Sequence, residues 1–326
     1  MNLLFIDWNP SIEVFKIGSF SVRWYALCWI LGLLGAYLVM RKLYRMEGID
    51  PAPGKQGKLE PTGKFDPLIF YCFFGVVLGA RLGHCLFYEP DYYLSSGKHI
   101  IEMFLPVKFE PNSWDWTMTG YSGLASHGGT IGLFLALLLY IRHTKLRTWV
   151  VLDLMGLVAP LTSFFIRMGN LMNSEIIGTQ TDLPWGFIFH TRESMVNGEL
   201  VARHPSQLYE AIAYLIIFII GWRIYKSNHA LDPALQNDKS KNGATTSQLS
   251  EKVKKNISVG SAFHFGFCLA AIFLFRFFVE FLKEVQGGAD DGSTALDMGQ
   301  MLSIPFILAG LYCMICLPGA KRKKEA

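Results

Sequence analysis

Apolar residues gather into long runs along this chain, and polar stretches rich in lysine, arginine, glycine and proline separate them. A helix of about 20 apolar residues is long enough to cross the ~30 Å hydrocarbon core of a bilayer. Seven runs reach that length: 22–42, 67–88, 121–141, 149–168, 207–225, 260–282 and 300–318. The pattern predicts an all-α polytopic membrane protein with seven transmembrane helices.

Composition supports this class. The chain has 326 residues, of which 51% are hydrophobic and only 17% are charged, whereas a soluble domain has roughly 25% charged residues. The first apolar run is not expected to be a signal peptide, because Asp7 and Glu13 precede it and Arg41 and Lys42 end it. The whole chain, 1–326, is predicted to be a single transmembrane domain.

The distribution of charge predicts the orientation. Most lysines and arginines lie in alternate connections, which are the stretches after the first, third and fifth runs, and in the C-terminal tail. The positive-inside rule then places the N-terminus outside and the C-terminus in the cytoplasm. The polar section 169–206 is expected to form a small extracytoplasmic cap. The lysine-rich stretch 226–258, almost free of aromatic residues, is expected to be a mobile cytoplasmic loop.

Charged residues inside the apolar runs are the first candidates for function. Arg276 and Glu280 interrupt the sixth run, where a charge costs roughly 2.5–3.5 kcal/mol or more. Their four-residue spacing places both on one helix face, and a purely structural pair is the alternative reading. Arg81 and Arg167 also lie in apolar surroundings. Three such arginines suggest a buried site for an anionic group.

The third run opens on Ser-His-Gly-Gly, which contains His127, Gly128 and Gly129. Glycines let a ligand or a neighbouring helix approach the backbone closely. His127 is a candidate general base or hydrogen-bond donor. A membrane histidine is as often a structural hydrogen-bonding residue, so this motif is weak by itself.

A denser motif follows the fourth run. Arg167, Asn170 and Asn173 are three residues apart and share a helix face, with Glu175 close behind. Helix capping explains the last polar residues of this stretch, but it does not explain an inward-placed Arg167. His204 belongs to a further polar stretch, 203–210, which opens the fifth run and is either catalytic or a network that stabilises the helix start.

All six cysteines lie in apolar segments, and Cys313 and Cys316 form a CxxC pair without neighbouring metal-ligand spacing. We interpret them as small hydrophobic residues.

Taken together, the motifs closely resemble the bacterial prolipoprotein diacylglyceryl transferase family. The segment from Arg167 to Glu175 is similar to the family pattern Gly-Arg-x-Gly-Asn-Phe-x-Asn-x-Glu. The matching stretches cover nearly the whole chain in order: 23–25, 79–83, 126–132, 167–175, 203–210, 276–281 and 298–305. The chain departs from the family at Ile166, Leu171 and His84, and its 226–258 stretch is longer.

The resemblance implies transfer of the diacylglyceryl group of phosphatidylglycerol to the lipobox cysteine thiol of a preprolipoprotein, with release of glycerol phosphate. It implies a multi-pass protein of the bacterial cytoplasmic (inner) membrane, with membrane lipid and signal peptides as partners, no cofactor, no metal and no nucleic acid. The catalytic residues would be His127, Arg167, Arg276 and Glu280. The substrate-binding residues would be Tyr25, Arg81 (as a structural or gate residue), Gly128, Gly129, Asn170, Asn173, Glu175 and His204.

Two other functions use the same observations differently. A transporter or channel for an anionic solute would use the same arginines, but it would favour inverted repeats, and none is visible. A CDP-alcohol phosphatidyltransferase would need an Asp-rich metal motif in a membrane helix, which the sequence does not show.

Overall fold

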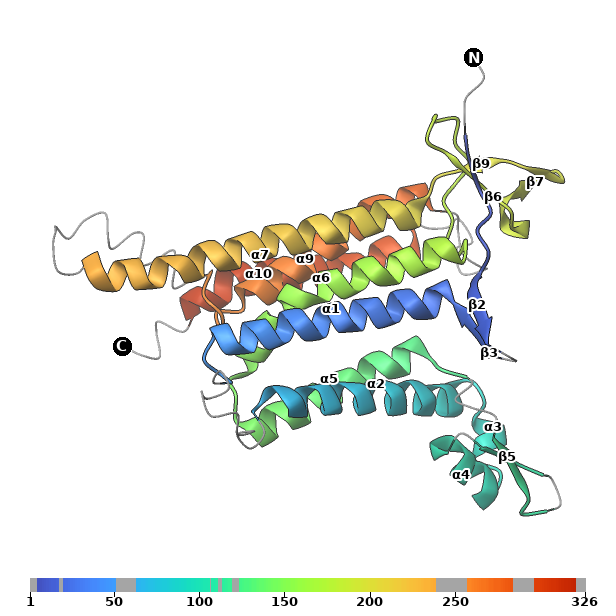
Figure 1. Cartoon of the computed structure of the whole chain (residues 1–326), viewed down its shortest axis with the longest axis horizontal. Helices are drawn as coiled ribbons and strands as arrows, with labels where there is room; N and C mark the ends of the chain where they lie inside the picture. Colours follow the sequence, from blue (N-terminus) through green and yellow to red (C-terminus); the bar gives the residue numbers. More distant parts are fainter. Residues whose placement is uncertain are drawn as a thin grey trace. The chain divides into compact units, whose positions relative to one another are not determined.

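The structure is a computed structural model that describes residues 5–17, 20–50, 63–105, 107–110, 113–118, 123–238, 257–283 and 296–320. It is mostly helical (Figure 1). Within those residues, six helices are long and apolar enough to cross a membrane: Trp24–Met46, Phe65–Phe87, Thr148–Met172, Ser206–His229, Phe263–Leu282 and Gly299–Leu317. The chain is therefore a multi-pass helical membrane protein.

The helix expected over 121–141 forms at Ser126–Thr144 (α5), but it is not among these six. Its apolar middle is flanked by polar residues at both ends, namely His127 to Thr130 and Arg142 to Thr144. The described part of the chain thus supports six of the seven predicted spans, and the seventh stays a prediction.

The chain forms two compact units. Unit 1 comprises residues 1–40 and 148–326, and unit 2 comprises residues 41–147. The first helix, α1 (Trp24–Met46), crosses this boundary near its end.

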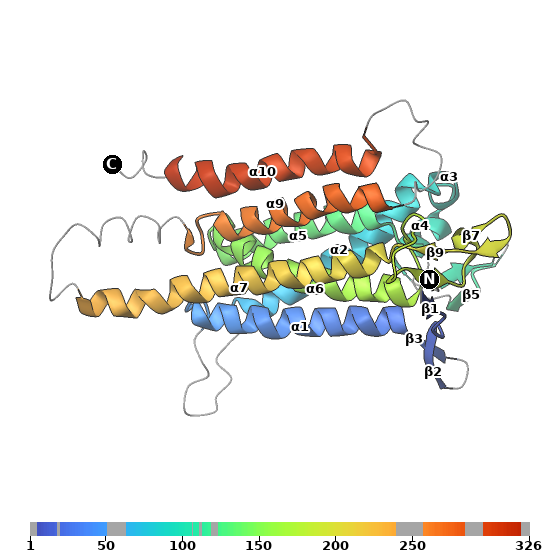
Figure 2. The same cartoon turned by 90° about the horizontal axis from the view of Figure 1, so that it is seen from above.

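Unit 1 is a helix bundle in which α6 packs against α7 and α9, and α9 packs against α10 (Figure 2). Their bounds are α6 Thr148–Met172, α7 Ser206–Asp238, α9 Phe263–Val279 and α10 Met298–Ala320. Close approach depends on glycine at Gly266, where an added Cβ would lie 2.6 Å from the carbonyl oxygen of Gly310. Small residues of this kind hold membrane helices together, because lipid gives helices no hydrophobic drive to associate.

One end of unit 1 carries short strands (Figure 1). A three-stranded sheet has the order β1-β6-β9, with β1 parallel to β6 and β6 antiparallel to β9. Two hairpins, β2-β3 and β7-β8, lie beside it. The bounds are β1 Ile6–Trp8, β2 Glu13–Ile17, β3 Phe20–Arg23, β6 Phe187–Phe189, β7 Met195–Val196, β8 Glu199–Leu200 and β9 Ala202–Arg203, with a 3-10 turn, η1, at Arg192–Ser194.

This sheet rests on the last turn of α6. Leu171, Ile177, Phe187 and Phe189 form a buried apolar cluster, and Trp8 packs against it. The Trp8 indole also donates to the carbonyl oxygen of Leu171 at 3.0 Å. The cap predicted for 169–206 thus corresponds to a turn and β6 to β9, with β1 added from the N-terminal segment.

The opposite part of α6 holds the start of α9. Asp153 is fully buried, and its carboxylate accepts hydrogen bonds from the backbone N–H groups of Gly260, Ala262 and Phe265 at 2.8, 3.0 and 2.9 Å. A carboxylate is the preferred partner for such unpaired N–H groups at a helix start. This contact fixes α9 against α6, and α9 in turn carries Arg276.

Helix α7 extends to Asp238, into the stretch that the sequence predicts to be a loop. Residues 226–238 of the stretch predicted as a loop, 226–258, are therefore helical. Residues 239–256 lie outside the described residues.

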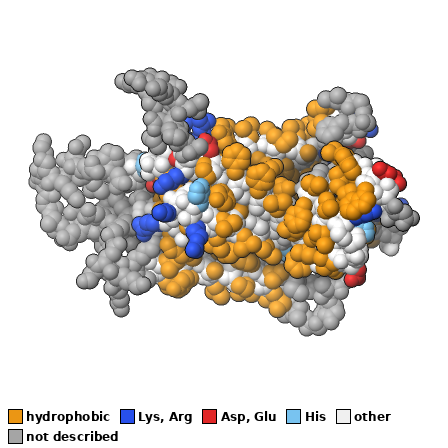
Figure 3. Space-filling view, turned by 90° about the horizontal axis from the view of Figure 1, so that it is seen from below, with side chains coloured by type: hydrophobic (Ala, Val, Ile, Leu, Met, Phe, Trp, Pro, Cys, Tyr) orange, Lys and Arg blue, Asp and Glu red, His pale blue; other side chains and the backbone are white. Residues whose placement is uncertain are grey.

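Unit 2 is built on two helices, α2 (Phe65–Phe87) and α5, whose backbones touch along a seam of small residues. A Cβ added to Gly79 would lie 2.5 Å from the carbonyl oxygen of Gly128, and one added to Gly132 would lie 2.0 Å from that of Gly75. Gly128 therefore faces α2, and helix packing accounts for its missing side chain. Figure 3 shows a broad apolar surface with lysine and arginine side chains gathered near one end.

Between α2 and α5 the chain forms a small folded segment, which we call the arm. It contains α3 (Pro90–Tyr93), α4 (Gly97–Phe104) and the antiparallel pair β4 (Val107–Phe109) and β5 (Trp116–Met118). Cys85, Tyr93 and Met103 form its buried apolar cluster. The arm is thereby packed onto the last turns of α2.

Candidate functional site

The end of α6 and the turn after it bring together a group of polar side chains in unit 1. Arg167 Nη1 donates to Asn170 Oδ1 at 3.3 Å, and the Asn170 amide donates to Glu175 at 3.1 Å. The turn returns on itself because Ser174 and Ile176 both adopt positive φ angles, 54° and 59°. Such conformations are unfavourable for residues other than glycine, and they concentrate at functional sites.

Glu210, in the second turn of α7, lies at the centre of this group. Its side chain is fully buried. One carboxylate oxygen lies 2.9 Å from Arg167 Nε, and the other lies 3.2 Å from Lys283 Nζ. Tyr214, one turn further along α7, donates its hydroxyl to Glu210 at 3.3 Å. A single buried carboxylate therefore holds two cations, one from α6 and one that follows α9.

Lys283 also pairs with Glu280, at 3.1 Å. Helix α9 ends at Val279, and Glu280 begins a 3-10 turn, η2 (Glu280–Leu282). The tighter turn directs the Glu280 carboxylate to Lys283. A Cβ added to Gly299 would lie 2.4 Å from the Glu280 carboxylate, so the start of α10 also lies against it. A helix N-terminus stabilises a neighbouring negative charge.

Two backbone contacts fix the position of Lys283. Thr179 donates its N–H to the carbonyl oxygen of Leu282 at 2.9 Å, and Gly178 forms an isolated bridge with Lys283. A Cβ added to Gly178 would lie 2.5 Å from the Leu282 oxygen and 2.7 Å from the His204 backbone oxygen. Only glycine allows the chain after α9 to approach the cap this closely.

Arg276 is half-buried on α9, one turn before the helix ends. Arg276 and Arg167 both interact electrostatically with the Tyr214 hydroxyl. In the described ranges of the chain, Arg167 and Lys283 have carboxylate partners whereas Arg276 has none. Arg276 is therefore the cation of this group that is available to an anion.

We call Arg167, Asn170, Glu175, Glu210, Tyr214, Arg276, Glu280 and Lys283 the polar cluster. Three cations and three carboxylates balance its formal charge. Within the described residues, no three His, Cys, Asp or Glu side chains come together in the arrangement that a metal ion requires.

Other predicted residues border the cluster. Tyr25 on α1 lies against Gly169, where an added Cβ would be 2.9 Å from the Tyr25 ring. The Asn173 amide donates to Glu175 at 3.0 Å. His204 Nδ1 lies 3.2 Å from the Tyr209 hydroxyl, and burial lowers the pKa of His204, which keeps the ring neutral near pH 7.

The structure thus gathers most of the predicted residues at one end of unit 1. It places the others, which are Arg81, His127, Gly128 and Gly129, in unit 2. His127 is the second residue of α5 and its side chain is exposed, whereas Arg81 is buried under the arm.

Sequence reasoning missed Lys283 and Tyr214, and it treated Glu210 only as part of a polar stretch at the helix start. Lys283 directly follows an apolar run, where a lysine ordinarily marks the membrane boundary. Glu210 and Tyr214 are four residues apart on α7, and this spacing was the available signal that both point to the same neighbours.

Comparison with known proteins gives the family of the chain. A family model described as prolipoprotein diacylglyceryl transferase matches residues 12–316. A phosphatidylglycerol–prolipoprotein diacylglyceryl transferase of Bacteroides fragilis is 46% identical over 312 residues, which cover 96% of this chain and 95% of the relative.

More distant relatives carry the same name. The protein of Tolumonas auensis is 34% identical over 309 residues, covering 94% of this chain and 96% of the relative. That of Porphyromonas gingivalis is 34% identical over 321 residues, covering 95% and 94%. These matches do not favour the transporter alternative. The chain belongs to the prolipoprotein diacylglyceryl transferase family.

Proposed function

We propose that this protein transfers the diacylglyceryl group of phosphatidylglycerol to the cysteine thiol of a preprolipoprotein. The proposal combines the family match with one structural observation, the polar cluster at the strand-bearing end of unit 1. Its charged side chains belong to helices that also present apolar faces to lipid. A phospholipid donor needs this combination, because its headgroup is ionic and its chains are not.

The reaction breaks one bond and forms another. The sulfur of the thiolate attacks the glycerol carbon that carries the phosphate, and a carbon–sulfur bond forms. The carbon–oxygen bond to phosphate breaks, and its electron pair leaves on the phosphate oxygen of glycerol phosphate. The thiol has an ordinary pKa near 8.5, so its proton must be removed for the thiolate to act.

Arg276 is assigned to the phosphate. It is the cluster cation without a carboxylate partner in the described ranges, and a guanidinium fork binds two phosphate oxygens while staying charged in a partly apolar setting. As negative charge grows on the leaving phosphate, a cation already in place stabilises the transition state without reorganising.

Arg167 has a second role in the proposal. Arg167 Nε lies 2.9 Å from the Glu210 carboxylate, and Arg167 Nη1 donates to Asn170. These two contacts fix the direction of the guanidinium group. Glu210 and Lys283 are positioning residues that fix Arg167 and the end of α9. Asn170 and Tyr25 are proposed to hydrogen-bond headgroup oxygens, and Glu175, Asn173 and His204 to position them.

His127 remains the candidate to accept the thiol proton, since histidine is the side chain that most often acts as a general base. Replacement of His127 by Gln tests this role, because glutamine retains hydrogen-bonding capacity but accepts no proton. Gly128 and Gly129 are proposed to bind substrate only through their position beside His127, since α2 already accounts for Gly128.

The proposed setting is the bacterial inner membrane. In the proposed topology α5 is the third of seven spans, the N-terminus lies outside and the C-terminus lies in the cytoplasm. Under the positive-inside rule, the strand-bearing end of unit 1 then faces outward. Phosphatidylglycerol of the outer leaflet would reach the polar cluster at headgroup depth.

A direct assay tests the function. The purified full chain is incubated with phosphatidylglycerol and a lipobox peptide, and mass spectrometry follows the diacylglyceryl increment on the cysteine. Arg276→Lys and Arg167→Lys should each lose most activity, because lysine keeps the charge but not the fork. Arg142→Lys, at an exposed arginine, is the matched control. Near-normal turnover in both lysine variants would refute the role of the two arginines in phosphate binding. Absence of product with the parent protein would refute the proposed function.

A further inference from the structure

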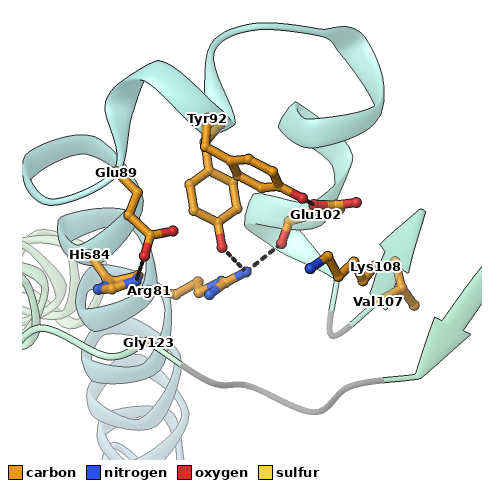
Figure 4. Close-up of a pocket in the computed structure, with 9 residues that line it drawn as sticks. Arg81, His84, Glu89, Tyr92, Glu102, Val107, Lys108 and Gly123 are labelled. Carbon is orange, nitrogen blue, oxygen red and sulfur yellow. Dashed lines mark hydrogen bonds and ion pairs between the residues drawn. The ribbon is translucent and has the colours of Figure 1, made fainter. Parts of the chain in front are cut away.

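A second polar pocket lies in unit 2, between the end of α2 and the arm (Figure 4). Its volume is about 520 Å³, enough for a small headgroup. Arg81, Tyr93, Lys108, His84 and Glu89 line it. Val107, Gly123, Tyr92 and Glu102 complete the lining.

Arg81 is fixed within the pocket. Its side chain is buried, and Nη2 donates to the Tyr93 hydroxyl at 3.2 Å and to the backbone carbonyl of Glu102 at 2.8 Å. The guanidinium carbon lies 5.1 Å from the centre of the Tyr93 ring. The Tyr93 hydroxyl and the Glu102 carbonyl thus orient the guanidinium fork.

Glu102 is a buried carboxylate of the lining, and two neighbouring groups donate to its oxygens. It accepts from the Tyr92 hydroxyl at 2.9 Å and from the backbone N–H of Phe109 at 2.6 Å. Burial and the neighbouring carboxylate raise the pKa of Tyr92 to about 12, so this hydroxyl stays protonated and continues to donate. In Figure 4 the Glu102 carboxylate points toward Tyr92 and away from Arg81.

Lys108 faces Arg81 from the other wall. It is the central residue of β4, and Figure 4 shows its ammonium group directed into the pocket toward the Arg81 guanidinium. Among the described residues, no acceptor lies within hydrogen-bonding distance of Lys108 Nζ. Two like charges directed at each other repel, and an anion placed between them removes that repulsion.

His84 and Glu89 lie side by side in the pocket lining. His84 Nε2 lies 3.6 Å from Glu89, and the ring stacks on Tyr88 at 5.9 Å. Gly123 has a φ of 68°, and a Cβ there would lie 2.3 Å from His84 Nε2. The glycine lets the chain pass behind the imidazole, so His84 stays paired with Glu89.

We propose that this pocket is a phosphate-binding site, with Arg81 and Lys108 as its cationic walls and the Tyr93 hydroxyl as a further polar group. The surrounding arm exposes large apolar side chains, among them Phe104, Leu105 and Trp116, which suit the headgroup depth of a bilayer. A phospholipid headgroup and free glycerol phosphate share the recognised chemistry. The inference does not rest on the proposed transferase activity.

Binding measurements on the purified full chain test the site. Soluble probes are inorganic phosphate and glycerol phosphate, titrated by calorimetry in detergent at about 0.15 M salt, which screens distant charges. The lipid probe is phosphatidylglycerol in nanodiscs, with lipid retention read by native mass spectrometry. Lys108→Gln should lower the affinity about threefold, and Lys108→Glu about tenfold, because reversal doubles the change in charge.

The control is Lys98→Gln, on α4 of the same arm, where the ammonium lies over the Trp114 ring at 5.0 Å. Each variant is also measured in an Arg276→Lys background, so that phosphate binding at the polar cluster is counted separately. Circular dichroism of each Lys108 variant checks that the substitution leaves the fold intact.

Loss of binding in the Lys108 variants, with Lys98→Gln unchanged, would support the site. The probe that loses affinity then identifies its source: the lipid alone indicates a headgroup, and the soluble compounds indicate free phosphate. Unchanged binding of all probes in Lys108→Glu would overturn the proposal. An equal loss in Lys98→Gln would overturn it too, because the effect would then be general charge.

Discussion

Glu210 offers the sharpest test of the polar cluster. Replacement by glutamine keeps its size and one acceptor oxygen but removes the negative charge between Arg167 and Lys283. The Glu210 side chain is fully buried, and Arg167 is only 13% exposed. Removing one partner of a buried ion pair costs about 3–5 kcal/mol, because the remaining charge is left uncompensated.

The structure places this variant at the lower end of that range. Lys283 keeps Glu280 at 3.1 Å when Glu210 is neutral, so the loss falls mainly on Arg167. We expect Glu210→Gln to lower the free energy of unfolding by about 3 kcal/mol and to reduce transferase activity through Arg167. The double variant Glu210→Gln/Arg167→Gln should regain about 1 kcal/mol, because the uncompensated guanidinium is gone.

Unfolding is measured by titration with SDS in mixed micelles and followed by circular dichroism. Glu13→Gln is the matched control, because Glu13 pairs with Lys16 on an exposed hairpin, where the loss should stay within about 0.5 kcal/mol. If Glu210→Gln unfolded with the same free energy as the parent, Glu210 would not be compensating the two cations. A double variant less stable than Glu210→Gln would refute the same reasoning.

Three further outcomes are expected. Gly178→Ala should lower the free energy of unfolding by about 1–3 kcal/mol, because its Cβ would meet a backbone oxygen just after α9. Gly97→Ala, with open space around it, should leave the free energy of unfolding unchanged, and equal effects of the two variants would contradict the packing argument. Burial holds the pKa of His204 below its ordinary value of 6.5, so the unfolded chain binds more protons than the folded chain below that pH, and stability should fall as the pH decreases from about 7. His204→Gln should flatten this pH dependence of stability, and an unchanged slope would exclude His204 as its cause. In a background without the six native cysteines, a cysteine at Ser174 should react with a membrane-impermeant reagent from outside the cell, and one at Lys145 only after permeabilisation; the reverse pattern would invert the proposed topology.

The sequence predicted the helices well, because apolar runs of membrane length leave little choice of structure. It placed the ends of these helices less well. The α7 helix continues through Tyr225 to Asp238, well past the end of the apolar run. Conversely, α9 ends at Val279, one residue before Glu280, which begins a 3-10 turn although its N–H still donates to the carbonyl oxygen of Arg276.

The candidate site was predictable in its residue types but not in its pairing. Arg167, Asn170 and Glu175 are close in sequence, and local turn chemistry brings them together. The pairing of Glu210 with both Arg167 and Lys283 joins three separate segments, and only tertiary packing sets it. Local periodicity carries no information about which helix will lie beside which.

The small-residue seam between α2 and α5 has a consequence for how unit 2 forms. The two helices are separated in sequence by the whole arm, so α2 must wait in the bilayer until α5 has been synthesised. Once the seam closes, the arm becomes a loop between fixed ends, and the entropy of closing such a loop grows only slowly with its length. Arms of different length and sequence are therefore compatible with the same pair of helices. The arm can therefore be replaced, in evolution or by design, while the α2–α5 pair stays the same.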